Sequence, residues 1–162
     1  MELGHLFQGH ALNAVDAKGR VSVPASFRAL IGKRALANSL DPDNTLMIGE
    51  HGGGDCLTAL DPVASAELDS RLRTSIEDMD ELEARRADAF GSLESVKFDT
   101  AGRMQLSPML RALGGIEDLA FFVGAGSTFQ IWNPLTAMRK LPETSRNRKP
   151  LAFLLNERGI AA

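Results

Sequence analysis

Cysteine is nearly absent from this 162-residue sequence, in which Cys56 is the only one. A single thiol has no partner for an intramolecular disulfide, and the N-terminal MELGHLFQGH lacks the basic start and apolar stretch of a secretory signal. Long apolar runs are missing as well, although 44% of the residues are hydrophobic, so we expect no segment to span a bilayer. The sequence therefore predicts a cytoplasmic protein with a packed core.

Catalytic and metal-binding signatures are also scarce. HGGGD at residues 51–55 resembles the oxyanion loop of some esterases, but the GxSxG elbow that would carry a nucleophilic serine is missing. The three histidines, His5, His10 and His51, are not grouped with Cys56 in CxxC or HxxxH spacing. We therefore expect neither an enzyme nor a metal site, and we expect no cofactor.

A basic excess, which is typical of nucleic-acid binders, is missing from the whole chain, since 18 basic and 21 acidic residues give a net charge of -3. The average hides an uneven distribution. Residues 61–88 carry nine acids and four arginines, a local charge of -5, so the rest of the chain sums to +2. Residues 16–34 and 139–149 each carry five bases and one acid, and this charge of +4 allows either segment to face phosphate.

The most informative feature is an internal repeat. DAKGRVSVPASFRALIG at residues 16–32 aligns without a gap with DTAGRMQLSPMLRALGG at 99–115, and seven of 17 positions are identical. GGGDCLTALDPV at 52–63 matches GAGSTFQIWNPL at 124–135, at an offset of 72 residues instead of 83. The first copy therefore holds about 11 extra residues, which we place in a surface loop at 33–44 because that segment is rich in turn formers.

Hydrophobic periodicity and turn residues predict the same β-β-α-β-β unit in both copies. The expected strands are 6–14, 20–23, 46–48 and 57–60 in the first copy and 93–98, 103–106, 119–123 and 129–132 in the second. A helix of one or two turns follows the second strand of each copy, because a proline opens it and a glycine stops it. These helices are expected between Pro24 and Gly32 and between Pro108 and the pair Gly114-Gly115.

A helical segment is expected between the copies. Asp61-Pro62 and Asn133-Pro134, which end the two copies, are typical of an N-cap followed by proline at the first helical position. After the first of them, apolar residues follow at broadly helical spacing: Leu68, Leu72, Ile76, Met79, Leu82 and Phe90. Ser75 with Asp78 is typical of a capping box that restarts the helix, so we expect a bent or paired helix.

These elements predict an α+β fold. Four short strands bury too little apolar surface to be stable alone, so we expect the two copies to form one pseudo-symmetric β-barrel with the acidic helices outside. The expected parts are a first unit at 5–60, an acidic helical insert at 61–91, a second unit at 92–140 and a C-terminal tail at 141–162.

The repeated DxxGR element has a turn at its centre. The carboxylates of Asp16 and Asp99 are expected to accept backbone N–H bonds across this turn, and Gly19 and Gly102 supply the positive φ that such turns often need. The alternative role for each aspartate is an ion pair with the arginine of its own turn. We therefore predict that all four residues brace the turns.

The arginine of each DxxGR element, Arg20 or Arg103, is the first candidate for a binding residue. A turn does not require arginine, and a guanidinium at the same corner of both copies makes a paired anion-binding surface. Arginine suits phosphate and guanine because its planar fork forms bidentate hydrogen bonds. Lys18 joins the first loop whereas Ala101 stands in the second, so we expect the first loop to bind more strongly.

Arg28 and Arg111 follow eight residues after these arginines, in the short helices. Each is flanked by apolar residues, which favours a partly buried guanidinium that joins hairpin to helix. Two roles stay open for this pair: bracing the aspartate of the turn, or extending the basic face.

DAKGRVSVPASFR resembles the N-terminal signature of MraZ proteins, bacterial transcriptional regulators built from two tandem units similar to the AbrB/SpoVT swapped-hairpin domain. The resemblance covers roughly residues 5–140 and includes both DxxxR elements and the acidic insert. It implies DNA binding through the DxxxR loops and ring-shaped homo-oligomers. It also implies control of the promoter of the division and cell-wall gene cluster, which includes the protein's own gene.

We therefore predict a nucleoid-associated transcription regulator that binds double-stranded promoter DNA with tandem repeats. Lys18, Arg20 and Arg103 are the primary DNA-binding candidates, and Arg28 and Arg111 are supporting ones. A ring would repeat the basic loops on one face, and the apolar residues of the acidic helices are candidate interface material. The alternative is a protein-binding scaffold module of the same fold, and a hydrolase that uses HGGGD is a third hypothesis.

Overall fold

The computed structural model describes residues 5–161. The elements are, in chain order, β1 (His10–Ala14), β2 (Arg20–Ser22), α1 (Ala25–Ala37), β3 (Thr45–Glu50), β4 (Leu57–Leu60), α2 (Pro62–Ser75), α3 (Met79–Gly91), β5 (Glu94–Lys97), β6 (Arg103–Gln105), α4 (Pro108–Gly114), β7 (Leu119–Gly124), β8 (Phe129–Trp132), α5 (Pro134–Lys140) and α6 (Arg148–Glu157). The β-β-α-β-β order expected for each copy is therefore present. None of the helices in this described part is long and apolar enough to cross a bilayer.

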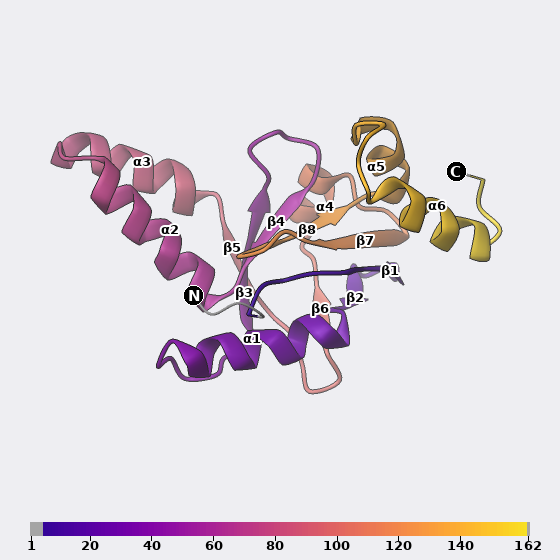
Figure 1. The fold of residues 1–162 in the computed structure, drawn as a ribbon, viewed down its shortest axis with the longest axis horizontal. Coiled ribbons are helices and arrows are strands. Elements are labelled where there is room, and N and C mark those ends of the chain that lie inside the picture. The colour runs from indigo at the N-terminus through magenta and orange to yellow at the C-terminus, as the bar shows by residue number, and fades with distance from the viewer. Residues whose placement is uncertain (1–4, 162) are drawn as a thin grey trace.

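The strands form two antiparallel sheets, and each sheet takes strands from both copies. Six strands lie in the order β1-β7-β8-β4-β3-β5, and β2 pairs with β6 in a separate two-stranded ribbon (Figure 1). Four strand pairs join the two copies: β1 with β7, β3 with β5, β4 with β8, and β2 with β6. No closed barrel is found within residues 5–161, because β1 and β5 remain the open edges of the larger sheet. The fold is thus α+β, and the predicted barrel is not confirmed.

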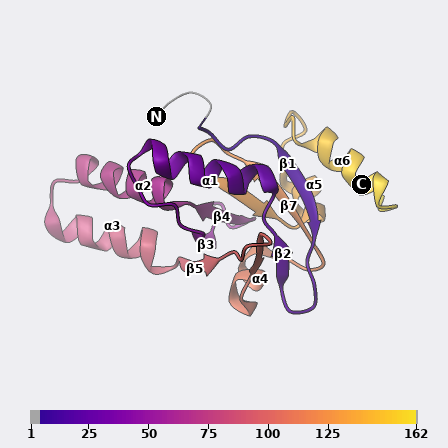
Figure 2. The ribbon, with the colours of Figure 1, turned by 90° about the horizontal axis from the view of Figure 1, so that it is seen from below.

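Both faces of the six-stranded sheet are covered, because successive side chains of a strand point to opposite faces. Phe122 and Ile131 pack in a cluster with residues of the ribbon, α1 and α4. Phe121 and Trp132 pack in a second cluster with α5 and α6. The ribbon and the C-terminal helices therefore lie on opposite sides of the sheet, and Figure 2 views the molecule from the side of α1 and the ribbon.

The helices that follow the ribbon strands differ in length. α4 ends at Gly114, and Gly115 caps it in the left-handed conformation with φ of 62°, as the sequence predicts. The prediction that Gly32 stops α1 is wrong, since the helix continues to Ala37. Glycine inside a helix costs about 1 kcal/mol, and the burial of Arg34 and Ala35 in the added turn offsets that cost. The predicted loop at 33–44 is therefore helical in its first part.

The acidic insert forms a helical hairpin, α2–α3, that projects from the body of the molecule (Figure 1). Of the bent or paired helix that the sequence predicts, the structure has the pair. Asp78 alone caps α3, accepting from the backbone N of Glu81 at 2.8 Å, so the predicted capping role of Ser75 is wrong. Leu72 and Ile76 are each only 9% exposed because they pack on α3 within the hairpin. They are therefore hairpin core and not a free interface.

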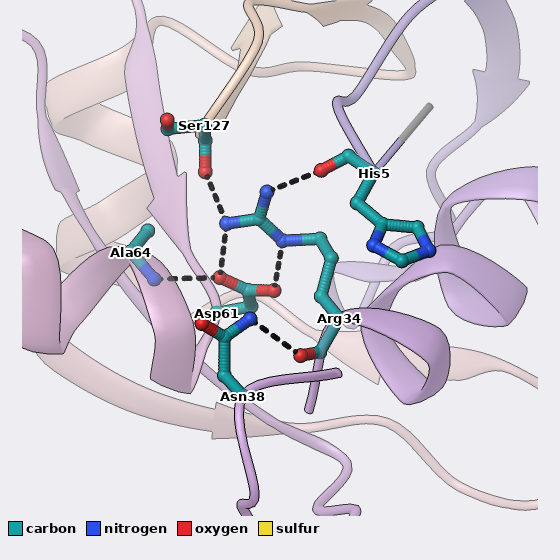
Figure 3. Close-up of polar contacts among 6 residues, drawn as sticks. All are labelled: His5, Arg34, Asn38, Asp61, Ala64 and Ser127. Carbon is teal, nitrogen blue, oxygen red and sulfur yellow. Dashed lines mark hydrogen bonds and ion pairs between the residues drawn. The ribbon is translucent and has the colours of Figure 1, made fainter. Parts of the chain in front are cut away.

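A buried ion pair ties α1 to the start of the hairpin. The Nε of Arg34 donates to Oδ2 of Asp61 at 2.7 Å, and Nη2 donates to Oδ1 at 3.2 Å (Figure 3). Both side chains are fully buried. Arg34 also donates to the carbonyl oxygens of His5 at 2.7 Å and Ser127 at 3.1 Å, while Asp61 accepts from the backbone N of Ala64. One guanidinium thus joins four segments that are distant in the sequence.

This burial corrects the sequence interpretation of one basic residue. Arg34 contributes to the +4 charge of residues 16–34, a segment expected to be able to face phosphate. In the structure its guanidinium is 0% exposed and lies over the Phe7 ring, with Cζ 5.0 Å from the ring centroid. Arg34 therefore serves the fold and is not available to an external anion.

Candidate nucleic-acid interface

The ribbon presents four polar side chains to solvent. Each strand has the burial pattern exposed, buried, exposed, so its central residue enters the core and its outer two face outward. Arg20 lies opposite Gln105, and Ser22 lies opposite Arg103. The two arginines therefore stand at diagonal corners of one exposed two-stranded surface.

The first loop is closed by the carboxylate of Asp16. Its Oδ1 accepts from the backbone N of Lys18 at 3.0 Å and of Arg20 at 2.9 Å, and its Oδ2 accepts from Arg20 Nε at 2.7 Å. The Arg20 backbone N–H first, and its side chain second, hold the pKa of Asp16 below its ordinary value. Asp16 thus stays ionised at neutral pH, and the Arg20 side chain, 44% exposed, remains accessible in this ion pair.

The second loop repeats this turn with a different side-chain arrangement. Asp99 Oδ1 accepts from the backbone N of Ala101 at 3.0 Å and of Arg103 at 2.9 Å. The Arg103 backbone N–H is the main reason that the pKa of Asp99 lies below its ordinary value. Within the described residues the Arg103 guanidinium has no ion-pair or hydrogen-bond partner, unlike that of Arg20. Arg103 is therefore the freer of the two arginines.

Each loop is held by the opposite copy. The backbone N of Leu106 donates to the carbonyl of Gly19, and the backbone N of Val23 donates to the carbonyl of Gly102, both at 2.9 Å. The two glycines have φ of 82° and 86°, which favours glycine strongly. The two DxxGR turns are therefore parts of one hydrogen-bonded structure.

Arg28 and Arg111 pack against the glycine of the opposite loop. A Cβ atom at Gly19 would lie 2.8 Å from Arg111 Nε, and one at Gly102 would overlap the Arg28 guanidinium. Arg28 Nε donates to the carbonyl of Val23 at 3.1 Å, whereas Arg111 Nε is buried without a hydrogen-bond partner among the described residues. Both arginines are partly buried, and both contact the turn backbone across the copy boundary.

A hollow beside the ribbon gathers residues that the sequence analysis did not single out. Lys97 of β5 and Gln105 of β6 line it together with Arg20, Asp99 and Arg103. Gln105 Nε2 donates to the Lys18 carbonyl of the first loop at 2.9 Å. Lys97 lies just before the second DxxGR element, and comparing residues upstream of the aligned repeat would have drawn attention to it.

The second basic segment, 139–149, lies on the other side of the sheet from the ribbon. It spans the end of α5 and the start of α6, which pack on the face that the ribbon does not cover. Arg148 in this segment donates through Nη1 to the carbonyl oxygens of Met138 and Leu141, so it stabilises the turn between the two helices. The two +4 segments therefore cannot face the same phosphate surface.

The remaining motifs form ordinary parts of the fold. HGGGD is the hairpin loop between β3 and β4, in which the backbone N of Gly54 donates to the His51 carbonyl at 2.7 Å. Burial raises the pKa of the Cys56 thiol to about 12, which disfavours the nucleophilic thiolate. Within residues 5–161 no group of three His, Cys, Asp or Glu side chains is arranged to hold a metal ion.

Sequence comparison identifies relatives over most of the chain, although no family model matches it. A transcriptional regulator MraZ from Rhodospirillum rubrum is 40% identical over 148 residues, covering 90% of this chain and 88% of the relative. One from Ruegeria pomeroyi is 37% identical over 136 residues, covering 80% and 78%. A third, from Beijerinckia indica, is 33% identical over 156 residues, covering 96% and 90%. The chain therefore belongs to the MraZ family of transcriptional regulators.

Proposed function

We propose that this regulator binds double-stranded promoter DNA through the ribbon and its two DxxGR loops. The observation that carries the proposal is the exposed ribbon face, with Arg20 and Arg103 at diagonal corners. A two-stranded ribbon fits the major groove, where arginine forms bidentate hydrogen bonds with guanine. The family resemblance suggests the target, which is tandem repeats in the promoter of the division and cell-wall gene cluster that includes the protein's own gene. Binding would then take place in the cytoplasm, at the nucleoid.

The direct test is binding of the purified chain to a duplex from immediately upstream of its own gene. A duplex of the same length and composition with shuffled sequence serves as the control. We expect tighter binding to the promoter duplex and a loss of affinity as salt rises, because phosphate contacts release counterions. Equal binding to both duplexes would contradict sequence-specific recognition, and no binding to either would favour the protein-binding scaffold.

Lys18→Ala should reduce the salt dependence of promoter binding. The lysine lies in the first loop, and its side chain is exposed two residues before Arg20. Loss of one phosphate contact lowers the slope of log affinity against log salt by about one unit per engaged subunit. A salt titration of duplex binding measures this slope, and a slope equal to that of the wild type would exclude Lys18 from the DNA-facing surface.

Arg28 and Arg111 position the loops in this proposal, each acting on the opposite copy. Arg111 packs on Gly19, so its replacement should disturb the loop that presents Arg20. We expect Arg111→Met and Arg20→Ala to be non-additive in duplex affinity, with a coupling of about 0.5–3 kcal/mol, as for residues in one network. The effects of Arg111→Met and Arg103→Ala should instead add.

Double-mutant cycles at low salt, where even weakened variants bind measurably, distinguish these two pairs. The reciprocal cycle should couple Arg28 to Arg103 and leave Arg28 and Arg20 additive. Equal coupling of Arg111 to both binding arginines would show a general loss of structure instead of positioning across the copies.

Self-association into a ring completes the proposal. The α2–α3 hairpin and α6 lie at opposite ends of the long axis (Figure 1). Met79 is 71% exposed on the acidic hairpin, and Phe153 is 64% exposed on α6, next to the basic segment 139–149. Opposite charges and exposed apolar side chains at the two ends favour head-to-tail contacts, which can close into a ring.

Phe153→Asp should therefore lower the mass of the assembly in light scattering and weaken promoter binding through lost avidity. Its circular dichroism spectrum should match the wild type, since the side chain is exposed. Leu72→Asp is the contrasting variant, because it places a charge in the hairpin core and should lose helical signal. A monomeric wild type that binds its promoter tightly would contradict the ring.

A further inference from the structure

The hollow beside the ribbon combines cations from both copies. Arg20 lines it from β2, Arg103 from β6 and Lys97 from β5. Among the described residues that line the hollow, Asp99 carries the only carboxylate. Asp99 Oδ1 already accepts two backbone N–H bonds of its own turn. The local charge is therefore positive, and the hollow is open at the surface that carries the ribbon's arginines.

Two of these three cationic side chains, those of Lys97 and Arg103, form no ion pair or hydrogen bond among the described residues. Arg20 is instead paired with Asp16. An arriving anion must displace Asp16 from its ion pair with Arg20, whereas at Arg103 it meets only the nearby Asp99 carboxylate, which forms no ion pair with that guanidinium. The second copy therefore offers two unpaired positive charges to an anion, although its loop itself contains only one basic residue, Arg103.

The repeat shows how the second copy acquires this charge. At the offset of 83 residues that relates the two turns, Lys18 corresponds to Ala101, and Lys97 corresponds to Ala14. Each copy therefore carries one lysine close to its DxxGR turn, inside the loop in the first copy and on the preceding strand in the second. Lys97 therefore supplies the positive charge near the second turn that Lys18 supplies near the first.

We propose that the hollow is a phosphate site, in which Lys97 and Arg103 hold one oxyanion of the DNA backbone. The proposal rests on DNA binding by the ribbon and assigns the second copy a contact of its own. It adds a phosphate contact of the second copy to the contacts expected of the first loop. Gln105 fixes the hollow next to the first loop through its hydrogen bond to the Lys18 carbonyl.

The test compares Lys97→Gln with Lys140→Gln in salt titrations of duplex binding. Both changes remove one exposed lysine charge, but Lys140 lies at the end of α5, across the sheet from the ribbon. Because Lys140 belongs to the segment 139–149 of the proposed ring contact, light scattering of each variant gives the assembly mass, and the slopes are compared per engaged subunit. Lys97→Gln should lower the log-log salt slope by about one unit per engaged subunit, and Lys140→Gln should leave it unchanged. Equal slopes for the two variants would overturn the proposal.

This test separates the phosphate site from sequence-specific recognition. A backbone contact carries no sequence information, so the Lys97 effect should be the same on the promoter duplex and on its shuffled control. Loss of discrimination between duplexes would refute the proposed function and leave this effect measurable. The Nζ resonance of Lys97 should shift on adding duplex. An equal shift with inorganic phosphate at the same phosphate concentration would indicate a site for free anions and overturn the assignment to DNA.

Discussion

Asp61→Ala is expected to lower the free energy of unfolding by about 3–5 kcal/mol, because it leaves the Arg34 guanidinium buried without its counter-ion. Both side chains are 0% exposed, so solvent cannot replace the lost carboxylate. The same carboxylate caps α2 by accepting from the backbone N of Ala64 at 2.9 Å. Loss of an N-cap alone costs about 1 kcal/mol.

Denaturant unfolding followed by circular dichroism measures this change. Asn133→Ala is the matched control, since Asn133 caps α5 at the equivalent position of the second copy without a buried cation. The double variant Arg34→Met with Asp61→Leu should recover much of the loss, because apolar replacement of both partners of a buried pair is often tolerated. If Asp61→Ala costs no more than Asn133→Ala, the ion pair contributes nothing beyond the cap.

The sequence could not predict this pair. Asp61 and Asn133 align in the repeat, and each precedes a proline, so both predict an N-cap and both are N-caps. The partner of Asp61 lies 27 residues earlier, in the turn of α1 beyond Gly32 that the sequence predicted as a loop. Charge counting placed Arg34 on a basic surface because composition does not distinguish buried from exposed guanidinium groups.

Local sequence patterns predicted the helices and turns better than they predicted which strands pair with each other. The proline and glycine that bound α4 and the paired helices of the insert follow from chemistry within a few residues. Pairing of β2 with β6 joins segments from different copies, and no short-range signal reports it. The repeat therefore predicted two similar turns, but not that each turn is held by the opposite copy.

Arg20→Ala is expected to abolish or strongly weaken promoter binding while leaving the chain folded. One bidentate arginine contact with a base contributes about 1–3 kcal/mol, and the loss is repeated in every engaged subunit of a multivalent assembly. The fold should tolerate the change, because an exposed ion pair contributes at most about 1 kcal/mol to stability. Asp16 also keeps two backbone hydrogen bonds, from Lys18 and from residue 20.

Arg20→Lys separates the two kinds of contact that Arg20 can make. Lysine keeps the positive charge but lacks the planar fork, so this variant should retain salt-dependent binding and lose discrimination between promoter and shuffled duplex. Arg146→Ala is the matched control, because it removes an exposed guanidinium on the side of the sheet that carries α5 and α6. Light scattering and thermal unfolding verify that assembly and fold are unchanged. If Arg20→Ala keeps the wild-type assembly and binds the promoter duplex with wild-type affinity, the ribbon is not the surface that reads DNA.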